Sequence, residues 1–292
     1  MYFSSESTPR AFYHGIRGRG VPVPCSAVEP TEPAALQPDR GLHKTTRQTP
    51  RGIGLLGPGM VAVWWMPTDQ VGTADCHRWL AILDRDERER ADRFRFEWDR
   101  RDFIAAHALL RHMLAFHLGR PAAAWQFAAN GFGKPAIAEG LRVPDIDFNL
   151  SHARDLVAAA VALHAAVGID VEKIDPAKAD FAVAQRYFAP AEIEILRRTP
   201  STEQAVCFFR LWTLKEAYLK ATGAGFGTSL DSFAFTLSPI RINFLTRLDD
   251  DPRRWHFEML PTTDAHVLSV AVGSHSDHTV HVVSRTVAAQ NL

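Results

Sequence analysis

The sequence predicts an α+β fold, in which helices and mainly antiparallel strands occupy separate stretches of the chain. Two observations support this class. Phe103, Leu110 and Leu114 recur at helical spacing in the first half of the chain. In the last third, short apolar runs alternate with turn residues, which predicts antiparallel strands at 233–237, 255–259, 267–272 and 280–283. With 292 residues, the chain can form one large domain or two small ones.

The other elements follow from the same rules, in chain order. A strand is expected at 61–66, and a long helical region runs from 80 to 118 and stops at Gly119. Residues 125–128 favour a short strand, and residues 130–135 have the composition of a turn. Further strands are predicted at 148–150, 157–163 and 167–171, and helices at 181–186, 190–198 and 203–222.

Residues 1–58 differ from the rest of the chain. Prolines recur throughout this stretch and no apolar periodicity is present, so we expect a disordered Pro/Gly-rich extension. Translation that begins at Met60, directly before the first predicted strand, would leave the same pattern.

Charge and composition exclude several classes of function. The formal net charge is zero, which disfavours binding to nucleic acid or to an acidic membrane. The longest apolar run, 157–169, is shorter than the roughly 20 residues that a membrane span needs. The three cysteines are too few and too scattered for a disulfide framework, so we expect a protein of the reducing cytoplasm.

The stretch 168–172, Gly-Ile-Asp-Val-Glu, places two carboxylates on one side of a predicted strand. Residues two apart in a strand share a face, so Asp170 and Glu172 project together. Two such carboxylates repel each other unless a cation lies between them, and oxygen ligands of this kind suit magnesium. A solvated strand edge is the alternative for these two residues taken alone.

The predicted helix at 203–222 carries a second polar group. Residues four apart share a helix face, so Trp212, Glu216 and Lys220 line up, with Lys215 at their flank. Taken alone, this pattern is equally typical of a helix-stabilising ion pair and a core tryptophan.

Two further segments carry polar groups suited to binding anions. Asn149, Ser151 and His152 follow apolar Phe148 and would present hydrogen-bond donors at the end of a strand. A nucleophile–base pair of Ser151 and His152 is rejected, because neighbours on an extended chain point to opposite faces. The turn containing Lys134 can bind an anion but lacks the P-loop pattern.

In this order and spacing, the four segments resemble the 4′-phosphopantetheinyl transferases of the larger, surfactin-synthetase-activating type. The resemblance covers residues 60 to 285 and rests on four strings, which are FGKP at 132–135, FNLSH at 148–152, GIDVE at 168–172 and WTLKEA at 212–217. It implies two similar α/β subdomains, 59–165 and 166–285, related by pseudo-twofold symmetry. Coenzyme A is expected in the cleft between them.

The resemblance also implies roles for individual residues. Asp170, Glu172 and Glu216 would bind Mg²⁺, and Lys220 would neutralise charge on the transferred phosphoryl group. Either Glu216 or Glu192 would accept the proton of the attacking serine, and the sequence leaves that choice open. The expected coenzyme A contacts are Arg88, Arg90, Lys134, Pro135, Ser151, His152 and Lys215, with Arg111 as a further neighbour. For the two helix arginines, ordinary surface ion pairs are an equal alternative.

The predicted reaction moves 4′-phosphopantetheine from coenzyme A to a serine of an apo acyl or peptidyl carrier protein. Such carriers serve fatty-acid, polyketide and nonribosomal peptide pathways. A degenerate coenzyme A-binding regulatory module and a phosphohydrolase are the competing interpretations. One departure from the family is Asp102, where many relatives have arginine; Arg101 is then the candidate to replace that arginine. A single chain already completes one cleft, so we expect a monomer.

Overall fold

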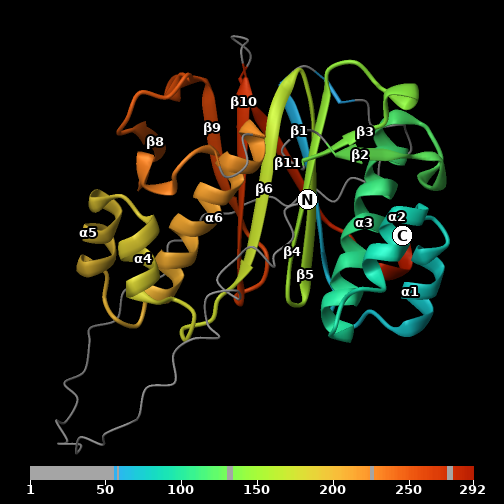
Figure 1. The fold of residues 1–292 in the computed structure, drawn as a ribbon, viewed down its shortest axis with the longest axis horizontal. Coiled ribbons are helices and arrows are strands. Elements are labelled where there is room, and N and C mark those ends of the chain that lie inside the picture. The colour runs from blue at the N-terminus through green and yellow to red at the C-terminus, as the bar shows by residue number, and fades with distance from the viewer. Residues whose placement is uncertain (1–55, 58, 130–133, 224–226, 275–278) are drawn as a thin grey trace, which may run out of the picture.

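The computed structural model describes residues 56–57, 59–129, 134–223, 227–274 and 279–292. Most of the predicted 1–58 extension and the centre of the 130–135 turn lie outside the described residues. Helices flank the strands on both sides, with α1 to α3 on the right of Figure 1 and α4 to α6 on the left. The arrangement gives two similar α/β halves, as predicted.

The N-terminal half packs three helices against an antiparallel arrangement of strands. Its elements are β1 (Met60–Pro67), α1 (Thr73–Leu80), α2 (Arg85–Ala91), α3 (Glu97–Leu118), β2 (Phe127–Ala129), β3 (Pro135–Ile137), β4 (Ile146–Ala153) and β5 (Leu156–Leu163). The long helical region predicted over 80–118 is divided into two helices, α2 and α3. Asp84 caps α2 through the backbone N–H of Glu87, and α3 begins separately after Phe96. Gly119 ends α3 with a φ of 72°, which glycine adopts readily.

The C-terminal half repeats the plan with a long central helix on a second sheet. Its elements are β6 (Ala165–Lys173), α4 (Phe181–Tyr187), α5 (Pro190–Arg198), α6 (Gln204–Thr222), β7 (Phe233–Leu237), β8 (Ile240–Phe244), β9 (Trp255–Leu260) and β10 (His266–Ser274). The predicted helices at 181–186, 190–198 and 203–222 are confirmed. Strands β6, β10 and β9 form a three-stranded antiparallel sheet, and β7 pairs with β8.

The last strand, β11 (His281–Thr286), corrects one expectation. It was predicted as another antiparallel strand of the C-terminal part, but it pairs in parallel with β1. The resulting four-stranded sheet has the order β11-β1-β5-β4. Arg78 of α1 also donates to the carbonyl oxygens of Ala289 and Leu292, so the chain ends on the N-terminal half. The subdomain limits 59–165 and 166–285 remain predictions. The last segment of the chain, although it follows the C-terminal half in sequence, packs on the N-terminal half.

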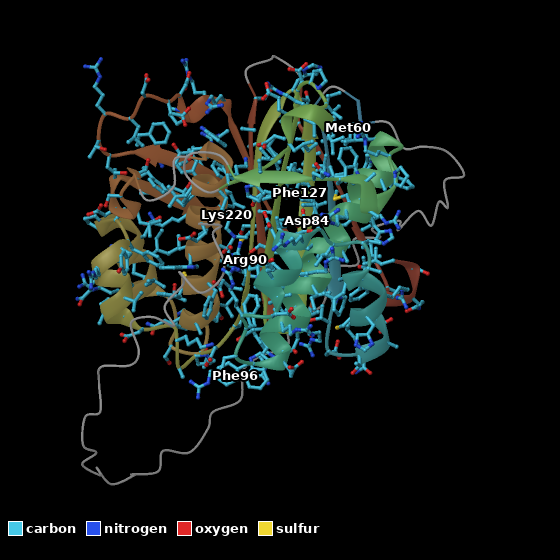
Figure 2. All side chains as sticks on the ribbon, turned by 45° about the vertical axis from the view of Figure 1, so that its right-hand side comes forward. Met60, Asp84, Arg90, Phe96, Phe127 and Lys220 are labelled. Carbon is cyan, nitrogen blue, oxygen red and sulfur yellow. The ribbon has the colours of Figure 1, made fainter. Side chains whose placement is uncertain are left out.

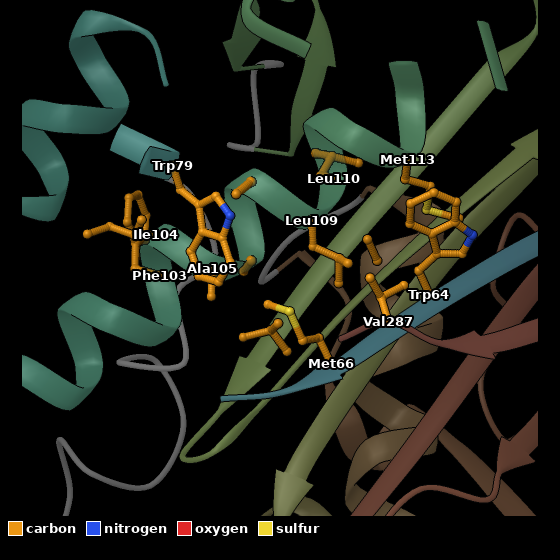
Figure 3. Close-up of a cluster of buried hydrophobic side chains, with 14 of the residues drawn as sticks. Trp64, Met66, Trp79, Phe103, Ile104, Ala105, Leu109, Leu110, Met113 and Val287 are labelled. Atoms are coloured by element: carbon orange, nitrogen blue, oxygen red, sulfur yellow. The ribbon is translucent and has the colours of Figure 1, made fainter. Parts of the chain in front are cut away.

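In the part of the chain that the structure describes, buried apolar side chains form three clusters. One lies under α3, where Val287, next to β11, packs beside Trp64 and Met66 of β1 (Figure 3). A second surrounds α6, and a third joins the two sheets through small and β-branched side chains such as Ala160 and Ile169. Small residues let the sheets approach closely, which fixes the relative position of the two halves. Among the described residues, no helix is both long and apolar enough to cross a membrane.

Candidate active site

Strands β4 and β6 meet through side chains at the junction of the two halves. Asp147, Asn149 and Ser151 point from β4 toward β6 at every second position. Their oxygen atoms accept hydrogen bonds from the backbone N–H groups of Val167 (2.8 Å), Ile169 (3.0 Å) and Val171 (3.2 Å), respectively. The alternating Asp-x-Asn-x-Ser pattern was a signal for this seam that the sequence reading missed.

Gly168 brings α6 directly onto β6. A Cβ atom at this position would overlap backbone atoms of Ala217 and Ala221 in α6. Only glycine permits so close an approach, which explains the glycine at the start of the GIDVE string. Because α6 lies this close, Glu216 and Lys220 reach the carboxylates of β6.

Asp170 lies at the centre of this cluster and is 5% exposed. Its Oδ1 accepts hydrogen bonds from Lys220 Nζ at 2.6 Å and from Ser151 Oγ at 3.1 Å. Lys220 Nζ also donates to Ser151 Oγ at 3.0 Å. The second carboxylate oxygen of Asp170, Oδ2, is buried and has no hydrogen-bond partner in the described part of the chain. A buried carboxylate oxygen without a donor is costly, so this atom is suited to bind a ligand.

Three acidic side chains influence one another here. Burial, followed by the negative charges of Asp170 and Glu216, raises the pKa of Glu172 well above its usual value. Burial and the charge of Asp170 raise the pKa of Glu216 to about 7. Burial also raises the pKa of Asp170, although Lys220 opposes this effect. The group therefore has more negative charge than its surroundings stabilise.

This donor set fits a hard divalent cation. All three members are carboxylates, Asp170 has a buried oxygen without a donor, and a cation would relieve their mutual repulsion. Over the described ranges, no group of three or more His, Cys, Asp or Glu side chains is already gathered at metal-binding distance. The other oxygen of Asp170, Oδ1, forms an ion pair with Lys220 Nζ.

Several of the residues expected to contact coenzyme A lie in the seam or in elements beside it. Lys134 Nζ donates to Asp147 (2.6 Å) and to the carbonyl of Val167 (3.1 Å), at the upper end of the seam. Pro135 starts β3 beside it. Arg90 stacks on Phe103, which in turn contacts the ring of His152. Figure 2 labels Arg90 on α2 and Lys220 on α6, which come from opposite halves. Arg88 is exposed on α2.

Lys215 and Glu192 are not part of this cluster. Both side chains are fully buried in the C-terminal core, where Lys215 Nζ lies 2.8 Å from Glu192 Oε2. Lys215 also donates to the carbonyl oxygens of Leu230 and Phe233. Glu192 accepts from the backbone N–H groups of Ala189 and Phe235. All three hydrogen atoms of Lys215, and both oxygen atoms of Glu192, are used in contacts inside the protein, which argues against the phosphate contact and the base role suggested for them.

Two other charged residues expected near the phosphate have structural roles. Arg111 is completely buried, pairs with Glu87 and donates to the carbonyl oxygens of Ala122 and Trp125. Asp102 is buried and accepts from Thr68 Oγ1 and from Arg101. Arg101 donates to both Asp102 and Asp155, so its guanidinium is paired with carboxylates inside the protein.

A pocket of about 320 Å³ opens beside the acidic cluster. Its polar wall includes His152, Arg154, Asp155, Glu172 and Lys173, and its apolar wall comes from Phe208, Phe209 and Trp212 of α6. Glu172 is the member of the acidic cluster that lines this pocket.

Family models match both halves of this chain. The model described as the 4′-phosphopantetheinyl transferase superfamily covers residues 166–271. The model of the N-terminal part of 4′-phosphopantetheinyl transferases covers residues 64–164. The chain belongs to the 4′-phosphopantetheinyl transferase superfamily. Within it, this protein is an enzyme of the larger, two-subdomain type, which transfers phosphopantetheine to carrier proteins.

Similar proteins come from distant organisms. The 4′-phosphopantetheinyl transferase HetI of Nostoc sp. is 36% identical over 198 residues, which is 68% of this chain and 82% of that protein. A phosphopantetheinyl transferase of Thraustochytrium sp. is 34% identical over 243 residues, covering 75% of this chain and 81% of the relative. A 4′-phosphopantetheinyl transferase of Bacillus subtilis is 32% identical over 160 residues, which is 55% of this chain and 69% of that protein.

Proposed function

We propose that this transferase depends on magnesium, which Asp170, Glu172 and Glu216 would hold. The observation that carries this proposal is the buried, unpartnered Oδ2 of Asp170 beside two carboxylates of raised pKa. Magnesium typically binds one or two protein carboxylates together with substrate phosphates. When bound, it would neutralise charge on the pyrophosphate of coenzyme A.

In the proposed reaction, the hydroxyl oxygen of the carrier serine forms a bond to the phosphorus next to pantetheine. The bond from that phosphorus to the bridging oxygen breaks, and adenosine 3′,5′-bisphosphate leaves with the electron pair. Lys220 lies within hydrogen-bond distance of Asp170 and Ser151, and its ammonium group would stabilise negative charge on the transferred group.

Glu216 is the better candidate for the base. It lies in the acidic cluster beside Asp170, where the attacking serine would meet the transferred phosphoryl group. Glu192 is fully buried against Lys215 and has no free oxygen for this purpose. Glu216 would accept the serine proton directly or through a water molecule.

Coenzyme A would extend along the seam. Lys134 and Pro135 would flank its adenine, and Ser151, His152 and Arg90 would contact its phosphates. Arg88 would add a more distant positive charge. No phosphate contact is assigned to Lys215, because the core already uses all three of its hydrogen atoms. The carrier would be an acyl or peptidyl carrier of a fatty-acid, polyketide or nonribosomal peptide pathway, and the enzyme a cytoplasmic monomer.

Intact-mass spectrometry of an apo carrier protein tests this proposal. Incubation with the enzyme, coenzyme A and Mg²⁺ should add about 340 Da, the mass of the phosphopantetheinyl group, and a chelator should prevent the addition. Glu216→Gln should abolish the mass shift. Glu192→Gln should retain turnover in the fraction of protein that folds. Transfer that persists in the chelator would overturn the magnesium assignment, and equal loss in both variants would leave Glu192 as a base.

A further inference from the structure

The turn between β4 and β5 carries polar contacts from both halves of the molecule. Asp155 Oδ1 accepts from Arg101 Nη2 of α3 at 3.0 Å. Its Oδ2 accepts from Lys173 Nζ, at the end of β6, at 2.6 Å. One carboxylate is therefore shared between a cation of the N-terminal half and a cation of the C-terminal half.

The backbone of this turn is held in an unusual conformation. Asp155 has a φ of 72°, in the left-handed region that residues other than glycine rarely adopt. Its N–H donates to Asp102 Oδ2 at 3.2 Å, and its carbonyl accepts from the backbone N–H of Thr68 at 3.0 Å. Asp102 is only 1% exposed. Such a conformation persists where surrounding contacts enforce it, and these bonds do so from two elements.

A second contact joins the turn to the C-terminal sheet. His266 Nε2, at the start of β10, lies 2.8 Å from the carbonyl oxygen of Arg154. A carbonyl can only accept, so Nε2 carries the hydrogen atom. Thr263 Oγ1, 2.7 Å from His266 Nδ1, then donates to the other ring nitrogen. The turn is thus connected to both β6 and β10.

The same residues form one wall of the pocket beside the acidic cluster. Arg154, Asp155 and Lys173 line it together with Glu172, which directly precedes Lys173 in β6. The facing wall belongs to α6. The separation of these walls, and the position of Glu172 in the polar wall, therefore depend on the contacts of the turn.

We propose that Asp155 is a positioning residue for the transfer reaction. Through its contacts with Lys173 and within the turn, Asp155 fixes the shape of the pocket beside Glu172. This inference rests on the proposed function, because it assigns the acidic cluster to the reacting phosphoryl group. Small errors in placing reactants cost rate more than binding, so the effect of Asp155 falls on turnover.

Asp155→Gly tests this role, since glycine accepts the left-handed backbone and only the carboxylate is lost. Asp145→Gly is the matched control. Asp145 also has a positive φ, of 62°, but it pairs with His164 on the surface, where the two side chains are 58% and 54% exposed. We expect Asp155→Gly to lower kcat about tenfold, with KM for coenzyme A and for the apo carrier each changed less than about threefold. The control should keep kcat within about twofold.

A double-mutant cycle separates positioning from general destabilisation. Lys173→Met removes the cation that Asp155 holds in β6, so the variant with both changes should lose no more turnover than the worse single variant. Calorimetric titration with coenzyme A should still give about one site per chain for each variant, which shows that the protein is folded. A kcat of Asp155→Gly equal to that of wild type would overturn the inference. So would losses of the two single variants that multiply in the double variant. A fall in kcat that is fully explained by a smaller number of coenzyme A sites per chain would overturn it as well. Wild-type enzyme that transfers nothing would instead overturn the proposed function.

Discussion

Lys215 Nζ and Glu192 Oε2 lie 2.8 Å apart in the C-terminal core, and neither side chain is exposed to solvent. Glu192 also accepts from the N–H of Ala189, at the start of α5, and from the N–H of Phe235 in β7. Lys215 extends from α6 to the carbonyl oxygen of Phe233. One ion pair therefore connects two helices and a strand.

Removal of one partner should strongly destabilise the protein. Lys215→Met leaves the carboxylate of Glu192 buried without its cation, and should lower the free energy of unfolding by about 3–5 kcal/mol. Denaturant unfolding measures this change. Arg198→Met is the control, because Arg198 and Glu194 form an ion pair on α5 with side chains 79% and 46% exposed. Its effect should be much smaller. Equal stability of Lys215→Met and wild type would contradict the structural role.

Gly168→Ala should disrupt the contact between β6 and α6. The added methyl group would overlap backbone atoms of α6, which cannot move independently of the helix. We expect a loss of about 3 kcal/mol or more in unfolding free energy and a large loss of transfer activity. Gly140→Ala is the control, since its Cβ would meet nothing within 4 Å. Thermal unfolding of both variants compares them, and a stable Gly168→Ala protein would show that the helix can shift.

Stability should depend on pH through Glu87. Burial alone would raise its pKa, but hydrogen bonds and charge from His107 and Arg111 outweigh burial and lower the pKa from 4.5 to about 2. A lowered pKa means that the ionised group favours the folded state, by about 3 kcal/mol above pH 5. That contribution is lost as the pH falls from about 4.5 to about 2.

Urea unfolding of wild type and Glu87→Gln across this range checks the assignment. The two proteins should differ most near neutral pH, and the difference should shrink as the pH falls through the window. A difference that stays constant between pH 7 and pH 3 would mean that Glu87 acts through packing and not through its charge.

Magnesium should stabilise the folded enzyme, and more strongly at higher pH. Because the pKa of Glu216 is raised to about 7, the carboxyl is largely protonated at pH 6 and must lose its proton to bind a cation. The rise in Tm on adding Mg²⁺ should therefore grow between pH 6 and pH 8. Asp170→Asn should abolish the rise, while Asp145→Asn on the surface should keep it. A pH-independent rise that survives in Asp170→Asn would place the cation elsewhere.

Much of the fold could be predicted from the sequence, because it depends on local patterns. The helices at 190–198 and 203–222 follow from apolar spacing and from the stop at Gly223. Residues 80–118 were predicted as one long helical region, since its charged residues are good helix formers, and the start of α2 depends on the cap at Asp84. The parallel pairing of β11 with β1 joins segments that are far apart in the sequence, and no local pattern specifies such a pairing.

The sequence by itself determined that Asp170 and Glu172 share a strand face and that Glu216 and Lys220 share a helix face, because strand and helix periods are fixed. Only the tertiary structure decided which lysine of α6 reaches the carboxylates. Lys215 and Lys220 are both cations on one helix, and the close contact at Gly168 turns Lys220 toward Asp170 while Lys215 enters the core. The tertiary structure also decided that Asp102 is a buried hydrogen-bond acceptor, since its partners Thr68 and Asp155 are far from it in sequence. Packing between distant segments sets these outcomes.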